Sequence, residues 1–375
     1  MNFLSYALPF VGVLTLVVFI HEYGHYIVAR KCGVTIDAFA VGMGPEICGF
    51  NDRHGTRWKL CWLPIGGYVK FADDENGASV PSRDKLQNMT AEQRTGALQT
   101  KSLAQKSAIV AAGPAFNIIS ATLIYIGTFW WFGTFGVEPV VDKLVPEGAA
   151  LRAGLKAGDR ITEIDGSAIQ RFTDLQRIVG QSPGSPLLFT IVRDGVTQKV
   201  SITPTLGERT DPIGNKVQIG LIGVQAGKGV QEQHGIVDAI GLGFKETGFI
   251  CKQIIMSLPR LPGAIAKVLM FQPQSELGGP IAIAEMTGEA AKTGPGTLLA
   301  WVAMFSIILG VMNLMPIPIL DGGHLVFYAL EAIRGKPLDA RNQEIGFKIG
   351  MALLATMMFA AILGDFMRKF GFGVG

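Results

Sequence analysis

The sequence predicts a polytopic α-helical membrane protein with about four membrane helices, a membrane-associated β-hairpin region and one external α+β domain. Of its 375 residues, 49% are hydrophobic and only 17% are charged, whereas ordinary soluble domains carry about 25% charged residues. Several apolar stretches reach the roughly 17–25 residues that cross a bilayer. A segment rich in short alternating runs and turn residues separates them. The net charge of +3 is too small to suggest a nucleic-acid partner, so the expected surroundings are a lipid bilayer.

The first membrane helix is expected at residues 1–31. No charged side chain occurs from Phe3 to Ile20. The segment lacks a basic start and a small-residue cleavage site, so it does not resemble a signal peptide. Arg30 and Lys31 follow it, and positive charge favours the cytoplasmic side. The N-terminus is therefore expected on the outer side of the membrane, and the end of this helix on the cytoplasmic side.

The motif His21-Glu22-Tyr23-Gly24-His25 lies near the cytoplasmic end of this helix. On a helix, His21 and His25 are one turn apart and face the same side. Two imidazoles at that spacing can bind one zinc ion, and Glu22 can act as general base on a zinc-bound water. The alternative is a pair of interfacial histidines at a helix end. Ionisable residues are costly inside a membrane, which favours the functional interpretation.

Residues 34–71 are predicted to form a membrane-associated β-hairpin region. Glycines and prolines interrupt short apolar runs, and the stretch Arg57–Leu63 alternates as a strand does. An extended edge beside a protease site could pair with an unfolded substrate segment. The alternative is a plain cytosolic β-loop. Residues 72–105, which are polar and charged, are expected to form a cytosolic loop.

Residues 106–132 form the expected second membrane helix, which carries no charge from Ser107 to Phe132. It contains the stretch Gly113–Asn117, whose small residues allow close helix packing. Asn117 is a polar group that must find a partner in lipid. Two interpretations stay open for this residue, a structural role between helices and a place beside the metal site.

The sequence pattern changes at residue 137 from an apolar stretch to strand and turn signals, and residues 137–205 are expected to form an external domain. A strand candidate at Val140–Leu144 precedes the run Pro146–Gly166, which resembles the PDZ-domain signature of bacterial proteases. Phe172–Val179 is expected to form the helix that borders the peptide-binding groove, and Leu187–Ile202 is expected to form the hairpin that completes the domain. PDZ folds bind extended peptide at an open sheet edge, so a peptide or substrate segment is the expected partner. Residues 206–295 are predicted to be an amphipathic or surface linker region.

The third membrane helix is expected at residues 296–324 and the fourth at 349–366. The third leads into the stretch Asn313–His324, where two prolines break or kink the helix. Catalytic zinc takes three protein ligands and leaves one position for water. Asp321 is the best candidate for the third ligand, and His324 is its rival. Asn313 could hydrogen-bond a substrate carbonyl or cap the broken helix.

Taken together, these motifs resemble the site-2 protease family of intramembrane zinc metalloproteases, and most closely the bacterial regulator of sigma-E protease type. The resemblance rests on H-E-x-G-H at 21–25, the small residues at 113–117, the PDZ signature, and N-x-x-P-x-P-x-L-D-G-G at 313–323. It covers nearly the whole chain. Many members carry two PDZ modules, whereas this sequence shows one.

The resemblance implies a role for individual residues. It assigns His21, His25 and Asp321 to Zn²⁺ binding and Glu22 to the catalytic base. It also implies a part in substrate handling for Asn313, and for Gly42 and Gly44, which form the G-x-G element of the family's membrane-reentrant hairpin.

The resemblance further implies hydrolysis of peptide bonds within transmembrane segments of other proteins. Examples are an anti-sigma factor already cut at an external site, or signal-peptide remnants. The implied location is a bacterial inner membrane, with the PDZ domain external and the active site near the cytoplasmic side. The alternative function is a non-catalytic PDZ-bearing membrane adaptor, which would need neither the motif glutamate nor the three candidate ligands.

Overall fold

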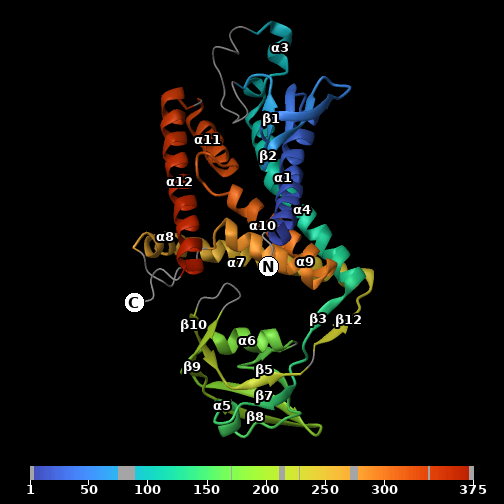
Figure 1. The fold of residues 1–375 in the computed structure, drawn as a ribbon, viewed down its shortest axis with the longest axis vertical. Coiled ribbons are helices and arrows are strands. Elements are labelled where there is room, and N and C mark those ends of the chain that lie inside the picture. Colours follow the sequence, from blue (N-terminus) through green and yellow to red (C-terminus); the bar gives the residue numbers. More distant parts are fainter. Residues whose placement is uncertain are drawn as a thin grey trace. The chain divides into compact units, whose positions relative to one another are not determined.

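The computed structural model describes residues 4–74, 89–169, 171–210, 216–227, 229–270, 278–336 and 338–370 (Figure 1). The chain divides into two compact units. The first contains Met1–Thr128, Ile236–Gln272 and Leu277–Gly375, and the second contains Phe129–Gly235 and Pro273–Glu276. Residues 75–88 of the expected cytosolic loop lie outside the described part.

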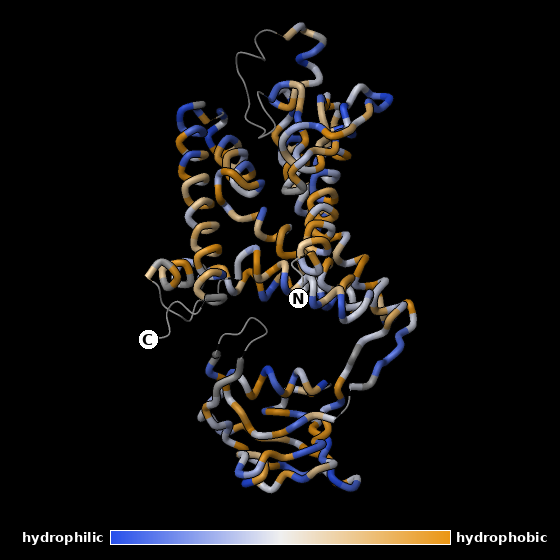
Figure 2. Tube along the Cα trace, viewed as in Figure 1, coloured by the Kyte–Doolittle hydropathy of each residue, from blue (hydrophilic) through white to orange (hydrophobic). Residues whose placement is uncertain are grey.

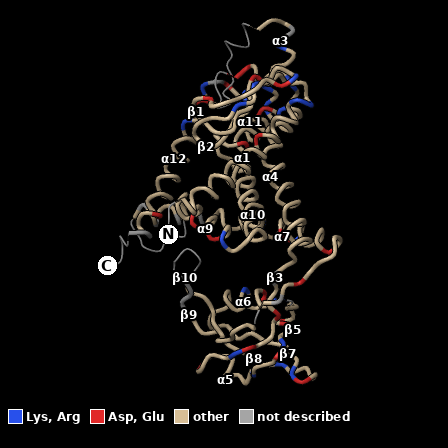
Figure 3. Tube along the Cα trace, turned by 45° about the vertical axis from the view of Figure 1, so that its right-hand side comes forward, with Lys and Arg blue, Asp and Glu red and all other residues tan. Residues whose placement is uncertain are grey.

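Four helices of the described chain are long and apolar enough to cross a membrane. They are α1 (Leu4–Lys31), α4 (Leu103–Phe132), α10 (Pro295–Asn313) and α12 (Ala340–Phe370). Hydrophobic residues run along them in Figure 2, and Figure 3 shows charged residues gathered toward the end of this unit that carries the β1–β2 hairpin and α11. The fourth helix is longer than the predicted 349–366, because the helical backbone continues through the charged residues that precede the apolar run.

The end of α1 is set by a glycine two residues after it. Gly33 has φ of 70°, the left-handed conformation that commonly closes a helix. The Val34 N–H then donates to the Ala29 carbonyl at 2.9 Å. Arg30 and Lys31 occupy the last turn, where positive charge is stabilised by the helix dipole.

The predicted hairpin region forms strands β1 (Ile36–Asn51) and β2 (Arg57–Phe71), and both strands bend back on themselves. Residues 38–41 of β1 pair with 57–60 on one side, residues 36–41 pair with 67–71 on the other, and residues 48–51 pair with 57–60. Gly42 and Gly44 have φ of 85° and 89°, which only glycine adopts without strain. These two glycines therefore allow the bend that makes a four-segment sheet from one hairpin.

The third predicted membrane helix, 296–324, is wrong as one continuous element. Helix α10 ends at Asn313, and α11 (Asp321–Arg334) begins after a non-helical connection. Pro316 and Pro318 explain the break, because proline has no N–H to continue a helix. The chain turns so tightly that a Cβ on Gly322 would overlap the Leu314 carbonyl.

The region 206–295, predicted as an amphipathic or surface linker, contains more regular structure than the sequence indicated. Its second part forms α7 (Ile236–Ser257), η2 (Leu258–Arg260), α8 (Leu261–Leu269) and α9 (Pro280–Thr293). Helix α7 buries a row of small residues, Ala239, Gly243 and Thr247, while Val237 and Phe244 are exposed. Helix α9, in contrast, packs on α1, where Gly288 lies against the Tyr6 ring.

A buried carboxylate fixes the start of α9. Asp365 of α12 is 2% exposed and accepts N–H bonds from Gly279 at 3.0 Å and Ile281 at 2.8 Å. A carboxylate at a helix N-terminus satisfies N–H groups that have no partner within the helix. This cap depends on a residue about 85 positions away, which is why no local pattern indicated it.

The second unit contains the elements that the PDZ-like signature predicted. In chain order they are β3 (Thr134–Gly136), β4 (Val141–Leu144), α5 (Ala149–Arg152), β5 (Arg160–Ile164), β6 (Ser167–Ala168), α6 (Phe172–Gly180), β7 (Leu187–Arg193), β8 (Val196–Ile202), β9 (Thr205–Thr210), β10 (Lys216–Leu221), β11 (Val224–Ala226) and β12 (Val230–Glu232). Strands β6-β5-β7-β8 form one sheet over a core that includes Ile161, Phe189 and Leu175.

The predicted end of this domain at residue 205 is too early. Strand β11 pairs with β4, with Val224 opposite Leu144, and Ile222 belongs to the same buried core as Phe189. Strand β4 thus takes its partner, β11, from a segment about 80 residues later. Periodicity could not reveal that pairing, because it is a long-range contact.

Candidate metal centre

Helix α1 brings the two motif histidines together. His21 and His25 are 7% and 9% exposed, and their ring centroids lie 4.8 Å apart. Their Nε2 atoms are separated by 3.2 Å. One helical turn places both imidazoles on the same face, as the sequence predicted, and directs both Nε2 atoms toward one point.

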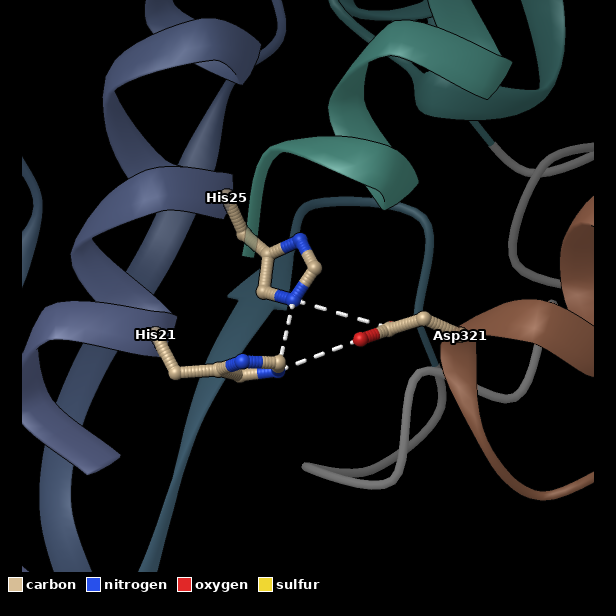
Figure 4. A group of neighbouring side chains, drawn as sticks. All are labelled: His21, His25 and Asp321. Atoms are coloured by element: carbon tan, nitrogen blue, oxygen red, sulfur yellow. Dashed lines mark hydrogen bonds and ion pairs between the residues drawn. The ribbon is translucent and has the colours of Figure 1, made fainter. Parts of the chain in front are cut away.

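The third member of the cluster comes from the other end of the chain. Asp321 is the first residue of α11, and its carboxylate is 3.1 Å from His21 Nε2 and 3.6 Å from His25 Nε2 (Figure 4). The three side chains form the one group of potential metal ligands found among the described residues. The structure therefore brings together the three candidate ligands that the sequence indicated.

The donor atoms fit a tetrahedral zinc ion. Zinc–ligand bonds of about 2.0–2.2 Å place tetrahedral ligand atoms roughly 3.3–3.5 Å apart. The three separations here, 3.1, 3.2 and 3.6 Å, bracket that range. Asp321 Oδ2 is also buried without a hydrogen-bond partner in the described structure. A buried carboxylate oxygen is costly unless a cation or donor compensates it, so this oxygen supports a cation at the centre of the group.

Helix α4 makes room for the imidazoles through a glycine. A Cβ on Gly113 would lie 2.6 Å from His25 Cε1 and 2.9 Å from His21 Cε1. Gly24, inside the motif, allows the same close approach from α1, because its Cβ would lie 2.5 Å from the Ala112 carbonyl oxygen. Small residues thus permit α1 and α4 to cross where the histidines lie.

Both histidines have partners on their outer nitrogens. His25 Nδ1 donates to the Ile109 carbonyl at 2.8 Å. His21 Nδ1 lies 3.2 Å from Asn117 Nδ2, and Asn313 Nδ2 lies 3.4 Å from His21 Nε2. Asn117 therefore lies beside the metal group rather than acting only between helices. Asn313 is the last residue of α10 and borders the same group.

Glu22 is next to the ligands but is not one of them. It interacts electrostatically with both histidines and Asp321, and its carboxylate accepts a hydrogen bond from the Val69 backbone. Gly67 of β2 lies against it, since a Cβ there would be 3.2 Å from Glu22 Cγ. A carboxylate beside, and not within, the ligand set is placed as a general base requires.

Other predicted residues are not in the cluster. His324 points its ring at Phe327 and Phe347, with centroid distances of 6.4 and 5.4 Å, so it does not join the ligand group. Gly42 and Gly44 lie in the bend of β1. Any role in substrate contact remains a prediction for these two glycines.

Sequence reasoning missed three features of this centre. Gly67 and the Val69 backbone contact the base, and the Ile109 carbonyl orients His25. A main-chain carbonyl has no signature in the sequence. The small-residue stretch at 113–117 was noted for helix packing, and it could have indicated the space that Gly113 leaves for the histidines.

Two histidines one helical turn apart, a distant aspartate and an adjacent glutamate define the class of zinc metalloproteases with a motif-borne base. The family model for peptidase family M50 matches residues 9–357, so the chain belongs to this family and is a zinc metalloprotease.

Relatives with similar sequences agree with that assignment. "Putative zinc metalloprotease Atu1380" of Agrobacterium fabrum is 41% identical over 98% of this chain and 97% of its own length. "Metalloprotease MmpA" of Caulobacter vibrioides is 36% identical over 98% of this chain and 96% of its own length. Among solved structures, the PDZ domain of the SdrC-like protein from Listeria monocytogenes aligns at 23% identity, covering 25% of this chain and 88% of that one, with a TM-score of 0.19.

Proposed function

We propose that this zinc metalloprotease cuts peptide bonds inside transmembrane segments of other proteins. The observation that carries the proposal is the position of the metal group. His21 and His25 lie in α1, a helix long and apolar enough to cross a membrane, and Asp321 follows α10, which is another such helix. A hydrolytic centre built on spanning helices is accessible to substrates that are themselves in the membrane.

The side chains of this centre would divide the chemistry between them. When bound, zinc supplies a Lewis acid that polarises the scissile carbonyl and activates water. Glu22 takes the proton from the attacking water and later delivers it to the leaving amine. Asn313, at the edge of the group, would donate a hydrogen bond from its amide to the substrate carbonyl as negative charge develops there.

A transmembrane helix must unwind before it can be cut, because its own hydrogen bonds hide the scissile bond. The β1–β2 sheet supports that step. Residues 67–71 of β2 lie beside the base, as the contacts of Gly67 and Val69 with Glu22 indicate. Extended backbone near the base can pair with an unwound substrate segment and satisfy its freed polar groups. Gly42 and Gly44 contribute by holding the sheet in its bent form.

The proposed setting is a bacterial inner membrane. Arg30 and Lys31 at the end of α1 favour the cytoplasmic side for the active site, with the N-terminus and the PDZ domain outside. The substrate class is a membrane protein already trimmed on the outer side, such as an anti-sigma factor, or a signal-peptide remnant. The PDZ domain would bind a peptide or substrate segment, or control access by size.

A reconstitution experiment tests the proposal. Full-length protein in proteoliposomes is given a single-span substrate, and the cut bond is located by mass spectrometry. We expect cleavage within the apolar segment, and loss of cleavage in Glu22→Gln with zinc content unchanged. The proposal would be refuted if the bonds cut lay only outside that segment, or if Glu22→Gln cut it at the wild-type rate.

The adaptor alternative has little to support it. An adaptor would need only the PDZ domain, whereas this chain keeps three ligands and an adjacent carboxylate in one buried group. The same Glu22→Gln variant separates the two functions, since an adaptor's peptide binding would be its only activity and the variant would leave it intact.

A further inference from the structure

The orientation of the two Nε2 atoms determines where the histidines must carry their protons. Both Nε2 atoms face the metal group, so a neutral ring that binds metal must have its proton on Nδ1. For His25 this tautomer is already enforced, because a carbonyl oxygen, that of Ile109, lies 2.8 Å from Nδ1 and can only accept. His21 has no such carbonyl, and its Nδ1 faces the side chain of Asn117.

Asn117 is fully buried and its side-chain amide is incompletely paired. Nδ2 is 3.2 Å from His21 Nδ1, whereas Oδ1 is buried with no hydrogen-bond partner in the described structure. In this orientation Nδ2 would donate to a bare Nδ1, and the ring proton would be on Nε2, the nitrogen that faces the other members of the metal group.

The other orientation of the amide suits a bound metal. The two ends of an asparagine amide have nearly the same shape, so a half-turn exchanges donor and acceptor without repacking. After that turn, Oδ1 accepts a proton from His21 Nδ1, and Nε2 is free to bind metal. The buried oxygen also gains the partner that it otherwise lacks.

Neighbouring contacts hold the rest of Asn117 in place. Ser306 of α10 donates to the Asn117 carbonyl at 3.0 Å, and a Cβ on Gly310 would lie 3.2 Å from Asn117 Cβ. The residue therefore cannot withdraw from His21 without separating α4 from α10. Rotation of the terminal amide is the remaining freedom.

We propose that Asn117 is a positioning residue that selects the metal-binding tautomer of His21, with its Oδ1 accepting the Nδ1–H bond. This role concerns the metal centre alone and does not depend on where the substrate is cut. Partners on the outer nitrogen of a ligand histidine contribute about 10–100-fold to metal affinity. A residue that only packs between helices would contribute nothing to it.

The test compares two substitutions of similar size in full-length protein purified in detergent. Asn117→Asp keeps an acceptor for Nδ1–H, while Asn117→Leu removes it. Zinc affinity is measured by competition with a chromophoric chelator, and the ligand field by the visible spectrum of the Co²⁺-loaded protein. We expect Asn117→Leu to weaken zinc binding about 10–100-fold and Asn117→Asp to bind zinc at least as tightly as wild type. Thr122→Val is the control, because it removes a hydroxyl of the same helix whose hydrogen bonds go to the Ile118 carbonyl and to Thr247, and it should keep wild-type affinity.

A second readout keeps the proposal testable if the leucine variant does not fold. In metal-free protein labelled with ¹⁵N-histidine, the His21 Nδ1 signal should be of the protonated type in both wild type and Asn117→Asp, since an acceptor oxygen faces that nitrogen in each. Wild-type zinc affinity in the leucine variant, equal weakening in both variants, or an unprotonated His21 Nδ1 in metal-free wild type would overturn the proposal.

Discussion

Replacing Gly113 with alanine should disable the metal centre without altering any ligand. A Cβ at this position would lie 2.6 Å from His25 Cε1 and 2.9 Å from His21 Cε1, and it would overlap His25 Nε2. Ordinary van der Waals contact requires about 3.4–4 Å between such atoms, so the His25 ring must retreat by roughly 1 Å. Displacements of about 1 Å in a catalytic group can cost about 10²-fold in rate.

We therefore expect Gly113→Ala to weaken zinc binding by at least about tenfold, or about 1.4 kcal/mol, and to lower proteolysis by about 10²-fold. Zinc affinity is measured by chelator competition, and folding by thermal unfolding in detergent. Gly127→Ala is the matched control, because Gly127 is in the same helix and its Cβ would meet no atom within 4 Å.

Alanine forms helices better than glycine, so neither variant should lose stability through helix propensity. The control should bind zinc as wild type does. If Gly113→Ala also kept wild-type zinc affinity, the close fit of α4 against the two histidines could not be what positions them, and the reasoning would be refuted.

Three further predictions address other parts of the molecule. Asp321→Ala should abolish stoichiometric zinc binding while His324→Ala retains it, as metal analysis of purified protein would reveal; full zinc in the aspartate variant would contradict the ligand assignment. Gly42→Ala should slow proteolysis at unchanged zinc content, because its Cβ would lie 2.5 Å from the Leu63 carbonyl oxygen and its φ is 85°; unchanged turnover would argue against a role for the bend. Burial alone would raise the pKa of Asp159, but hydrogen bonds and charge from Arg193, at 2.7 Å, outweigh it and lower that pKa. A lowered carboxyl pKa adds stability above its unfolded value of about 3.9 and loses it as pH falls below that value. Amide exchange in β5 and β7, corrected for intrinsic rates, should therefore accelerate more between pH 5 and 3 in wild type than in Asp159→Asn; equal acceleration would exclude this linkage.

Much of the site could be predicted because its chemistry lies in short motifs. The spacing of His21 and His25 determines that they share a helix face, and their place in an apolar stretch indicated a function. Asp321 could be selected as the third ligand for two reasons. A catalytic zinc ion requires three protein ligands, and this aspartate follows a long apolar run, where charged residues are few. His324 was a reasonable rival on composition alone, and only its packing against Phe327 and Phe347 removed it.

The elements that could not be predicted depend on contacts between distant segments. Residues 206–295 look like a linker because charged residues interrupt their apolar runs. In the structure, Ile222 completes the core of the second unit, and α9 packs on α1 with Asp365 capping its start. The reason is physical, since a β-strand partner or a helix cap is defined by position in space and leaves no local periodicity.

The sequence by itself predicted the class of protein, the two candidate ligands on one helix, the candidate base and the choice of Asp321. Those features follow from residue chemistry and from the fixed geometry of a helix, which a short motif encodes completely. Only the tertiary structure decided how the ligands are held. The space left by Gly113, the Ile109 carbonyl on His25 and the Asn117 amide on His21 arise where α1, α4 and α10 cross. Hydrogen bonds and close packing between helices act over a few ångströms, so they exist only once the helices have met.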